Sequence, residues 1–537
     1  MEKGNIFPII LLFFILTGLG YLASFQKLDP DFGWHFRTGS LILEKGVPEV
    51  DWYSYPMSNF PWINHEWLTD ILIYKIYSLF GFHFTLLFFI ILVSLAFIIL
   101  IKPSAFWDFL IPVLIGYWAC LGFLGIRSQL LTIFFIAILW KILREFLDSN
   151  SRSIYLCPIL FVIWVNLHGG FFVGLFLLFL ILILELFKKT SFFQKLLSWR
   201  FFSQQSFQPQ PFKKISILFI ILILSFLATF INPYEPRIYE EIFRTIGDQF
   251  LRFHIAEWLP LFSTDSLPIF TILYTSLFWG LFILFRRKID FTYSIILPVF
   301  FVFALLSQRH FFIFVIISIP IFARLIFYFK ESIDPTALRL LLPGFKKWLV
   351  LFVILGILLI GWYPILRGVF TKTLSLVYPE KAIPFLKTLP LSENLLNEYA
   401  WGGYLIWQLP ERKLFIDGRM PSWRQNGEFV FGDYVKIMEA DEGFQELLEK
   451  YKIKIILLNK EKKTEAEKRQ KTETKSKNTF LQEKLKPGLS QFLKEHQRFA
   501  KLLGIDSFNK NIYQELINLG WKVVYEDDTA LILRKPK

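Results

Sequence analysis

The sequence predicts a polytopic α-helical membrane protein with a C-terminal α/β domain. Hydrophobic residues make up 54% of the 537 residues, and the mean hydropathy is +0.48. Apolar runs of about 20 residues, long enough to cross a hydrocarbon core of about 30 Å, recur along the first two thirds of the chain. From about residue 380 the apolar runs are short and alternate with amphipathic stretches, which is typical of a soluble α/β domain.

Eleven segments are apolar enough to be candidate spans. They are residues 5–25, 83–101, 109–125, 129–146, 154–167, 170–187, 215–231, 268–285, 291–307, 311–328 and 348–364. The first span has a charged start but no small-x-small cleavage site, so we expect a retained helix rather than a signal peptide that is removed. The sequence HGG at 168–170 interrupts an apolar region, and its two glycines permit a tight turn.

Charge placement predicts how the chain crosses the membrane. With the N-terminus in the cytoplasm, the inner segments carry more than twice as many Lys and Arg as the outer loops, as expected of cytoplasmic loops. Eleven spans then place the C-terminal domain outside the cytoplasm. The same distribution accounts for most of the net charge of +14, so it predicts no nucleic-acid partner. We therefore expect a multi-pass protein of a prokaryotic plasma membrane.

The predicted organisation is a transmembrane domain at 1–379, with a large first outer loop at 26–82, and an α/β domain at 380–537. In the loop, LILEK and EWLTDILIYKIYSLF predict amphipathic helices at the membrane surface. Near the C-terminus, WKVVYEDDTALILR predicts a hairpin with EDDT as its turn. The charged run at 460–478 has no large apolar residue, which predicts a disordered or frayed insertion. Cys120 and Cys157 lie in or beside apolar runs, without the spacing of a zinc site.

The first outer loop concentrates ionisable side chains, beginning with the stretch DPDFGWHFR. Its main candidates are Asp29, Asp31, Asp51, His65 and Glu66. A carboxylate held near apolar groups can acquire the raised pKa that a general base needs. Two carboxylates two residues apart can also hold a divalent cation. The alternative is that Asp29 caps a surface helix and the tryptophans of the loop form an interfacial belt.

The stretch DPDFGWHFRTGSLILEKGVPEVD resembles the first extracytoplasmic loop of the GT-C superfamily of integral-membrane glycosyltransferases. The oligosaccharyltransferase catalytic subunits of that superfamily begin this loop with an Asp-Pro-aromatic-aromatic-His pattern. The matching positions are Asp29, Pro30, Trp34, His35, Gly39, Gly46, Pro48 and Asp51. Two extra residues separate the proline from the aromatic–His pair, so either Asp29 or Asp31 takes the catalytic position of the family. The WWDYG peptide-binding motif of those subunits is absent. EYAWGGYLIW, at 398–407, lies at a comparable position in the chain but lacks the acidic residue between the aromatic residue and the glycine.

The whole chain also resembles uncharacterised bacterial membrane proteins of this superfamily, with similar NLHGGF, EWLP and FIDGR stretches. The resemblance implies a polyprenyl-phosphate-linked sugar donor and a glycan, lipid or protein acceptor on the outer face of the membrane. Asp29 or Asp31 would take the proton of the acceptor hydroxyl, and His35 would hold the loop or a ligand. Cations would neutralise the departing phosphate, and the candidates are Arg309, His310, Arg127 and Arg37. A divalent cation, Mg²⁺ or Mn²⁺, is an open alternative, with pocket or metal positions at Asp51, His65, Glu66, His168 and Glu257.

Two other classes of function compete with a glycosyltransferase. A transporter or lipid flippase would place ionisable residues near the middle of spans, whereas Glu185 is nearly the only acid deep in a predicted span. A non-enzymatic scaffold for envelope polymer assembly would bind through the outer loops without catalysis. Individual residues also have plainer roles: an arginine at a span end can anchor the helix by snorkelling, and Asp417 and Arg419 of FIDGR predict a structural ion pair.

Overall fold

The computed structural model describes residues 6–149, 151–190, 209–262, 269–332, 378–473 and 511–536, and this part of the chain is mostly helical. It divides into two compact units. Unit 1 comprises Met1–Lys27, Ile76–Ile242 and Glu257–Lys372, and unit 2 comprises Leu28–Lys75, Phe243–Ala256 and Thr373–Lys537. The predicted span at 348–364 lies outside the described residues.

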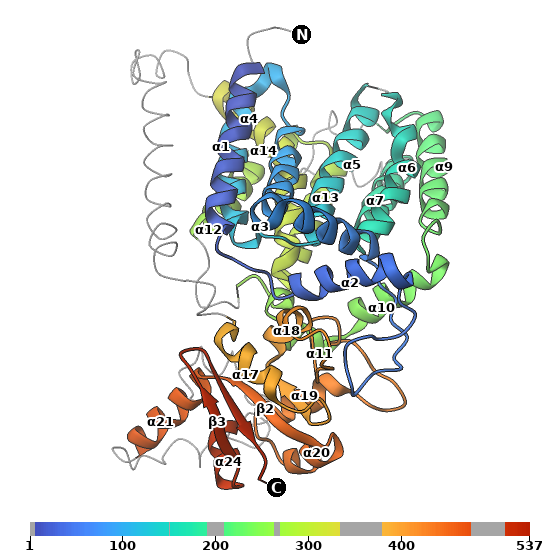
Figure 1. Cartoon of the computed structure of the whole chain (residues 1–537). Coiled ribbons are helices and arrows are strands. Elements are labelled where there is room, and N and C mark those ends of the chain that lie inside the picture. Colours follow the sequence, from blue (N-terminus) through green and yellow to red (C-terminus); the bar gives the residue numbers. More distant parts are fainter. Residues whose placement is uncertain are drawn as a thin grey trace. The chain divides into compact units, whose positions relative to one another are not determined.

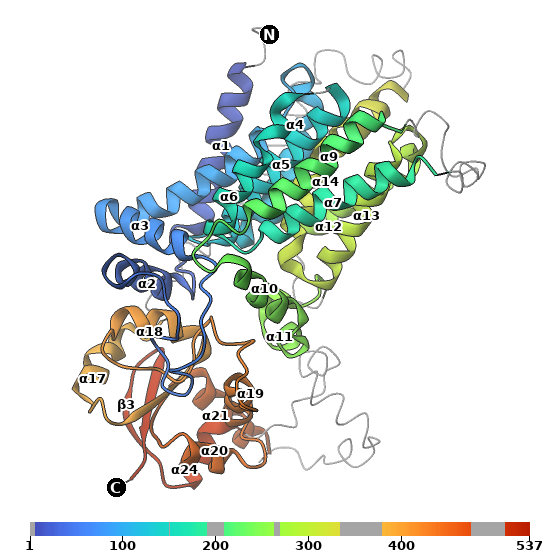
Figure 2. The same cartoon turned by 90° about the vertical axis from the view of Figure 1, so that its right-hand side faces the viewer.

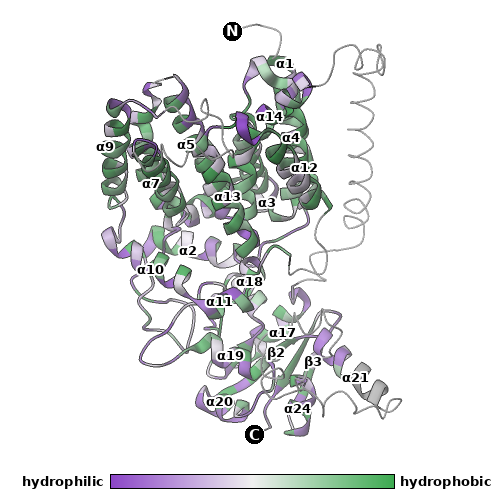
Figure 3. Ribbon diagram, turned by 180° about the vertical axis from the view of Figure 1, so that it is seen from behind, coloured by the Kyte–Doolittle hydropathy of each residue, from purple (hydrophilic) through white to green (hydrophobic). Residues whose placement is uncertain are grey.

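Unit 1 is a bundle of apolar helices (Figure 1). Its longer helices are α1 (Ile6–Ser24), the second part of α3 (Trp67–Ile98), α4 (Phe106–Cys120), α5 (Gln129–Ser149), α6 (Cys157–Leu167), α7 (Phe171–Phe187), α9 (Phe212–Ala228), α12 (Ile269–Phe285), α13 (Phe291–Leu306) and α14 (Phe311–Ser332). Figures 1 and 2 show α9 beside α6 and α7, and α14 packs against α4. Hydrophobic residues dominate these helices (Figure 3). Because Phe7 and Phe14 of α1 are exposed, an apolar face of this helix suits contact with lipid.

Five helices of the described part are long and apolar enough to cross a membrane. They are Ile6–Ser24, Trp67–Ile98, Pro103–Phe123, Ile269–Lys288 and Gln308–Ser332. Three shorter apolar helices cover Arg152–Leu167, Phe171–Phe187 and Phe291–Leu306. The chain is therefore a helical membrane protein by composition and length, and the count of eleven spans stays a prediction.

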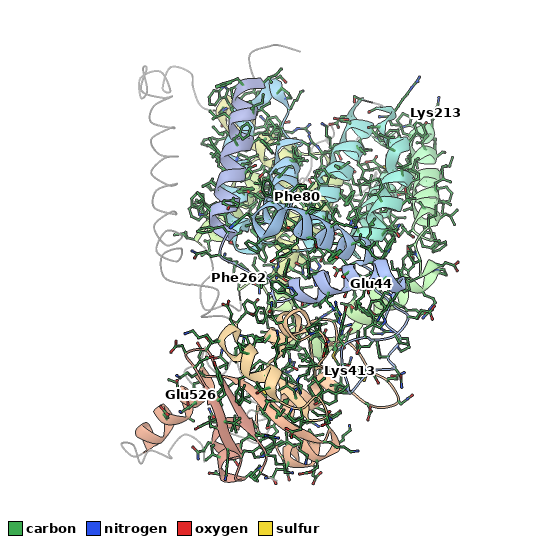
Figure 4. All side chains as sticks on the ribbon, in the orientation of Figure 1. Glu44, Phe80, Lys213, Phe262, Lys413 and Glu526 are labelled. Atoms are coloured by element: carbon green, nitrogen blue, oxygen red, sulfur yellow. The ribbon has the colours of Figure 1, made fainter. Side chains whose placement is uncertain are left out.

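The membrane topology is open to a direct test. We expect a reporter fused after Lys213, at the start of α9 (Figure 4), to lie in the cytoplasm. We expect a reporter fused at the C-terminus to lie outside the cytoplasm. The reason is the excess of Lys and Arg in the predicted inner segments. Paired phosphatase and fluorescent-protein fusions at both positions measure this. A cytoplasmic C-terminus would contradict the placement of the α/β domain.

Helix α3 changes character at Gly81, whose φ of 78° and ψ of −174° interrupt the helix. The part before Gly81 carries Asp70 and Lys75, and the part after it is apolar. The predicted span at 83–101 therefore begins just after the kink, at the start of the second part of α3. Glycine suits this position because other residues rarely adopt a positive φ.

Two predicted breaks between apolar helices are present. His168 separates α6 from α7 in an extended conformation, and a Cβ on Gly170 would lie 2.1 Å from the Thr132 hydroxyl oxygen. Only glycine fits at that distance. Between α13 and α14, Gln308–His310 form a single 3-10 turn. Both breaks place a histidine at a helix end.

Unit 2 contains a four-stranded sheet with the order β1-β2-β4-β3. The strands are β1 (Asn394–Asn397), β2 (Ile453–Asn459), β3 (Lys522–Glu526) and β4 (Ala530–Arg534). β1 pairs with β2 in parallel, and β4 pairs antiparallel with both β2 and β3. The hairpin predicted around EDDT is thus β3–β4. Burial explains the central position of β2 and β4, because Ile455–Leu458 and Ala530–Leu533 are fully buried.

Helices of unit 2 contribute side chains to a hydrophobic core that includes this sheet. They are α2 (Phe32–Lys45), α11 (Gln249–His254), α17 (Ile383–Thr388), α18 (Gly402–Gln408), α19 (Val430–Met438), α20 (Phe444–Lys450) and α24 (Ile512–Asn518). One continuous hydrophobic core joins the sheet to the first-loop residues Trp34, Tyr53, Phe60 and Trp62. The sequence places that loop with the transmembrane domain, whereas Leu28–Lys75 form one compact unit with the C-terminal residues. These buried aromatic side chains are the physical reason.

The charged insertion predicted at 460–478 differs from the expectation. Glu461–Glu473 form helix α21, while 474–478 lie outside the described residues. The start of this helix is fixed, since the Asn459 side chain accepts a hydrogen bond from the Glu461 N–H at 2.9 Å. Lys463 also pairs with Glu526 of β3 at 2.7 Å. Capping and a charge pair with β3 therefore support the first turns of α21.

Candidate functional site

The carboxylates of DPDFGWHFR lie at the start of α2 in unit 2. Asp31 occupies the N-cap position of α2, but its side chain accepts no capping hydrogen bond. Its Oδ1 instead accepts a hydrogen bond from the Trp34 indole N–H at 2.9 Å. Asp29 accepts a hydrogen bond from the Asp31 backbone N–H at 3.0 Å. The two acids therefore have different tasks: Asp29 shapes the turn, and Asp31 turns its carboxylate toward Trp34.

His35 lies directly beside this pair, in a buried polar network. Its Nδ1 is 2.6 Å from Asp70 Oδ1, and its Nε2 is 3.7 Å from Glu66 Oε2. The Asn64 side chain donates to the other Asp70 oxygen at 2.7 Å. Burial by itself lowers the pKa of His35, but the hydrogen bond and charge of Asp70, with the charges of Glu66 and Asp31, outweigh it and raise the pKa to about 9. His35 is therefore an imidazolium at neutral pH.

This charge state gives the first-loop network a definite pH dependence. Because the pKa of His35 rises from 6.5 to about 9 on folding, its contribution to stability is complete below about pH 6.5 and is lost as pH rises through 9. We expect a loss of roughly 3 kcal/mol at most. Thermal unfolding of the detergent-solubilised protein between pH 6 and 9.5 measures it. A His35→Gln variant should show a flatter profile, and an equal slope in both proteins would contradict the assignment.

A second group in unit 2 is centred on Arg419. Its Nη2 donates to Asp51 Oδ1 at 2.8 Å and to Asp417 Oδ2 at 2.7 Å. All three side chains are at most 3% exposed. Burial lowers the pKa of Arg419, but the two carboxylates outweigh it and keep the pKa raised. Asp51, predicted as a pocket or metal position, is thus one arm of a buried ion pair.

Unit 1 contains a separate group of cations near helix ends, which we call the cation cluster: Lys27, Arg127 and Arg309 with Glu257. Arg127 and Glu257 form an ion pair, and the Gln129 amide donates to Glu257 Oε2 at 3.0 Å. The Arg309 guanidinium lies 4.6 Å from the centre of the Trp258 ring. Burial by itself raises the pKa of Glu257, but the charges of Arg127 and Arg309 outweigh it and hold the pKa below its usual value.

Lys27 extends the cation cluster. Enclosure by protein atoms first, and the positive charge of Arg127 second, lower the pKa of Lys27. The only carboxylate among these four side chains is Glu257, so the cluster carries a net positive charge. Since like charges repel, such a group gains free energy from a bound anion. It suits a phosphate at the membrane surface.

The segment that carries Glu257 is fixed against the turn that carries Arg309. Gln308 N–H donates to the Leu259 carbonyl at 2.9 Å, and Leu261 N–H donates to the Leu305 carbonyl at 3.1 Å. The Ser307 hydroxyl donates to the Glu257 carbonyl at 3.2 Å. His310 faces the same tryptophan, with its ring 6.2 Å from that of Trp258. EWLP and the turn Gln308–His310, which carries Arg309 and His310, are thus bonded to each other.

The remaining candidate residues lie in other places. His168 and the Thr132 hydroxyl lie 2.7 Å apart in a hydrogen bond in unit 1. His65 is 3.7 Å from Glu66 in unit 2. Arg37 belongs to α2 in unit 2. The candidate list therefore contains two structural groups, an acidic one in unit 2 and a cationic one in unit 1.

The described residues contain no cluster of side chains that could bind a divalent cation. In that part of the chain, no three His, Cys, Asp or Glu side chains gather as metal ligands. Charge accounts for this at two positions: the protonated His35 has no lone pair to offer, and Arg419 already neutralises Asp51. The Mg²⁺ or Mn²⁺ alternative therefore stays a prediction.

Sequence reasoning missed Asp70 and Lys27, and of Arg419 it predicted only the ion pair with Asp417, which the structure confirms. Asp70 lies in a stretch predicted only as an amphipathic helix, although its position on the buried face was a signal. Arg419 was assigned a local pair with Asp417, but its bond to Asp51 spans 368 residues and has no local signature. Lys27 follows the first span directly, where a lysine is easily taken for an anchor.

These features define a helical membrane protein with a net-positive cluster in its apolar unit and a buried acidic network in its second unit. No protein-family model matches the chain, and no curated protein matches it. Among solved structures, the chain is similar to the crystal structure of ArnT from Cupriavidus metallidurans bound to undecaprenyl phosphate, with 11% identity, a TM-score of 0.44 and 100% of both chains covered.

Proposed function

We propose that the protein is a membrane glycosyltransferase that moves a sugar from a polyprenyl-phosphate-linked donor to an acceptor on the outer face of the membrane. The observation that carries the proposal is the net-positive cation cluster among the apolar helices of unit 1. Arg127, Arg309 and Lys27 supply charge where the phosphate of a lipid would need it, while the apolar helices suit a polyprenyl chain.

The reaction also requires a carboxylate that takes the proton of the acceptor hydroxyl. The acceptor hydroxyl oxygen attacks the sugar C1, and the bond from C1 to the phosphate oxygen breaks, with its electron pair leaving on the lipid phosphate. Asp31 takes the hydroxyl proton as general base, a role worth about 10²–10⁴-fold in rate. In unit 1, Arg127 and Arg309 are the candidates to bind the lipid phosphate and to neutralise its charge. His35, a protonated donor, holds the α2 start rather than accepting the proton.

The transporter alternative has one observation in its favour. Glu185 is buried in unit 1 and pairs with Lys188 at 2.9 Å, and buried ionisable residues often mark transport paths. However, Lys188 also bonds Asp290 at 2.9 Å, and the Thr292 hydroxyl donates to Glu185 at 2.6 Å. Such a closed network stabilises helix ends and leaves these carboxylate oxygens engaged. The glycosyltransferase remains the better-supported function.

Co-purified lipid provides the direct test. We expect mass spectrometry of the purified protein to find a polyprenyl phosphate or its sugar conjugate, and an Arg309→Gln variant to lose most of it. Loss of one charge-assisted contact costs about 1.5–3 kcal/mol, or roughly 10- to 100-fold in affinity. Arg287→Gln is the matched control, because Arg287 lies between α12 and α13 at the end predicted to be cytoplasmic. Equal lipid in both variants, or none in the wild type, would contradict the proposal.

A further inference from the structure

The segment from Leu414 to Arg419, which contains FIDGR, contacts the first outer loop through the backbone of Leu414 and through the side chain of Arg419. The Tyr55 N–H donates to the Leu414 carbonyl at 3.0 Å, and the Leu414 N–H donates to the Tyr53 carbonyl at 2.9 Å. On the other side, Asn397 at the end of β1 accepts a hydrogen bond from the Phe415 N–H at 3.1 Å. Residues 414–416 therefore connect the sheet to the loop that carries the candidate base.

Arg419 fastens this connection from the side. Its guanidinium bonds Asp51 and Asp417, and it also lies 4.3 Å from the centre of the Trp62 ring. Trp62 in turn packs edge-on against Trp34, with ring centres 6.4 Å apart. Trp34 is the residue whose indole N–H holds Asp31 Oδ1. A continuous set of contacts thus runs from Arg419 to the Asp31 carboxylate.

Gly418 touches the same carboxylate directly. A Cβ built on Gly418 would lie 1.9 Å from Asp31 Oδ1. The backbone of Gly418 is not in the positive-φ region, so alanine could adopt this conformation. The requirement for glycine therefore comes from the close approach of Asp31, and not from the turn itself.

We infer that the Asp417–Gly418–Arg419 turn belongs to the transfer site, with Gly418 and Arg419 as positioning residues for the Asp31 carboxylate. This inference rests on the proposed function, because it takes Asp31 as the general base. The hydrogen bonds of Arg419 hold the turn in place. Because Gly418 has no side chain, the Asp31 carboxylate can occupy the space beside it. A misplacement of about 1 Å in a catalytic group can cost ~10²-fold in rate.

The test uses Gly418→Ala in the full-length protein. The probe is a mixture of undecaprenyl phosphate-linked glucose, galactose, mannose and arabinose in detergent micelles, with water as the surrogate acceptor and release of undecaprenyl phosphate as the readout. We expect kcat to fall ~10- to 100-fold, because the added methyl group displaces the Asp31 carboxylate. We expect KM for the donor to change less than about twofold, because the methyl group does not alter a contact with the donor. A role in packing alone would lower the melting temperature and leave the kcat of the folded protein unchanged.

Gly432→Ala is the matched control. It adds the same methyl group in the same unit, against the Phe429 ring rather than Asp31, and should keep the wild-type kcat. If Gly418→Ala does not fold, Arg419→Lys decides: it keeps the charge but loses the fork that holds two carboxylates, so kcat should fall in the same way. A wild-type kcat in either folded variant overturns the inference.

Asp31→Asn separates this inference from the proposed function. In the Asp31→Asn background, Gly418→Ala should cause no further loss of kcat, because both changes act on one carboxylate. If Asp31→Asn is inactive and Gly418→Ala is fully active, the positioning role is wrong and the base assignment stands. If Asp31→Asn is fully active, the base assignment itself is wrong, and the inference falls with it.

Discussion

Asp31→Asn is expected to lower the rate of sugar transfer by roughly 10²–10⁴-fold, the usual contribution of a general base. The amide oxygen can still accept the hydrogen bond that Trp34 gives to Asp31 Oδ1, so the start of α2 should keep its structure. What the variant loses is the ability to take a proton. Turnover of the co-purified donor, with lipid content and melting temperature measured on the same sample, tests this expectation.

Asp29→Asn is the matched control for that experiment. Asp29 uses Oδ1 to accept the Asp31 backbone N–H at 3.0 Å, a bond that asparagine can also accept. Its substitution should therefore cost far less activity than that of Asp31. If both variants keep wild-type turnover, the loop is architectural, and Glu66 or Glu257 becomes the next candidate base.

Hydrophobic patterns in the sequence predicted the helices of unit 1, the breaks between them and the β3–β4 hairpin. Apolar runs located the helices of unit 1, and the Gly81 kink, the break at His168 and the turn at Gln308–His310 all fall where the sequence breaks its hydrophobic pattern. The β3–β4 hairpin is likewise a contact between neighbours in sequence. Each of these depends on hydrophobic periodicity or on glycine, which act within a few residues.

The contacts that define the candidate site are not local, and sequence patterns could not provide them. Asp51 and Asp417 meet at Arg419 from opposite ends of the chain, so neither half of the sequence reveals the pair. Arg127 and Glu257 are separated by 130 residues. The candidate residues themselves could be chosen by chemistry, because a carboxylate or arginine beside an apolar span is costly without a partner. Which partner each one finds depends on packing.

Arg127→Gln and Glu257→Gln are expected to change donor affinity in opposite directions. In the cation cluster, the Glu257 carboxylate already accepts hydrogen bonds from Arg127 and from Gln129. A lipid phosphate that binds this cluster would need the same donors, so the two anions compete. Removing the arginine should weaken binding, and removing the negative charge of Glu257 should strengthen it. Each change should be roughly 10- to 100-fold, because one hydrogen bond to a charged group is worth about 1.5–3 kcal/mol.

Titration of lipid-free protein with undecaprenyl phosphate, followed by native mass spectrometry, measures both affinities. The Arg127→Gln/Glu257→Gln double variant should not show the gain of the Glu257 single variant, because the gain requires the donor that Glu257 occupied. A fall in affinity in Glu257→Gln would mean that the carboxylate orients Arg127 for the lipid rather than competing with it. Unchanged affinity in all three variants would place the donor elsewhere, since a phosphate held by this cluster must respond to the loss of either charge.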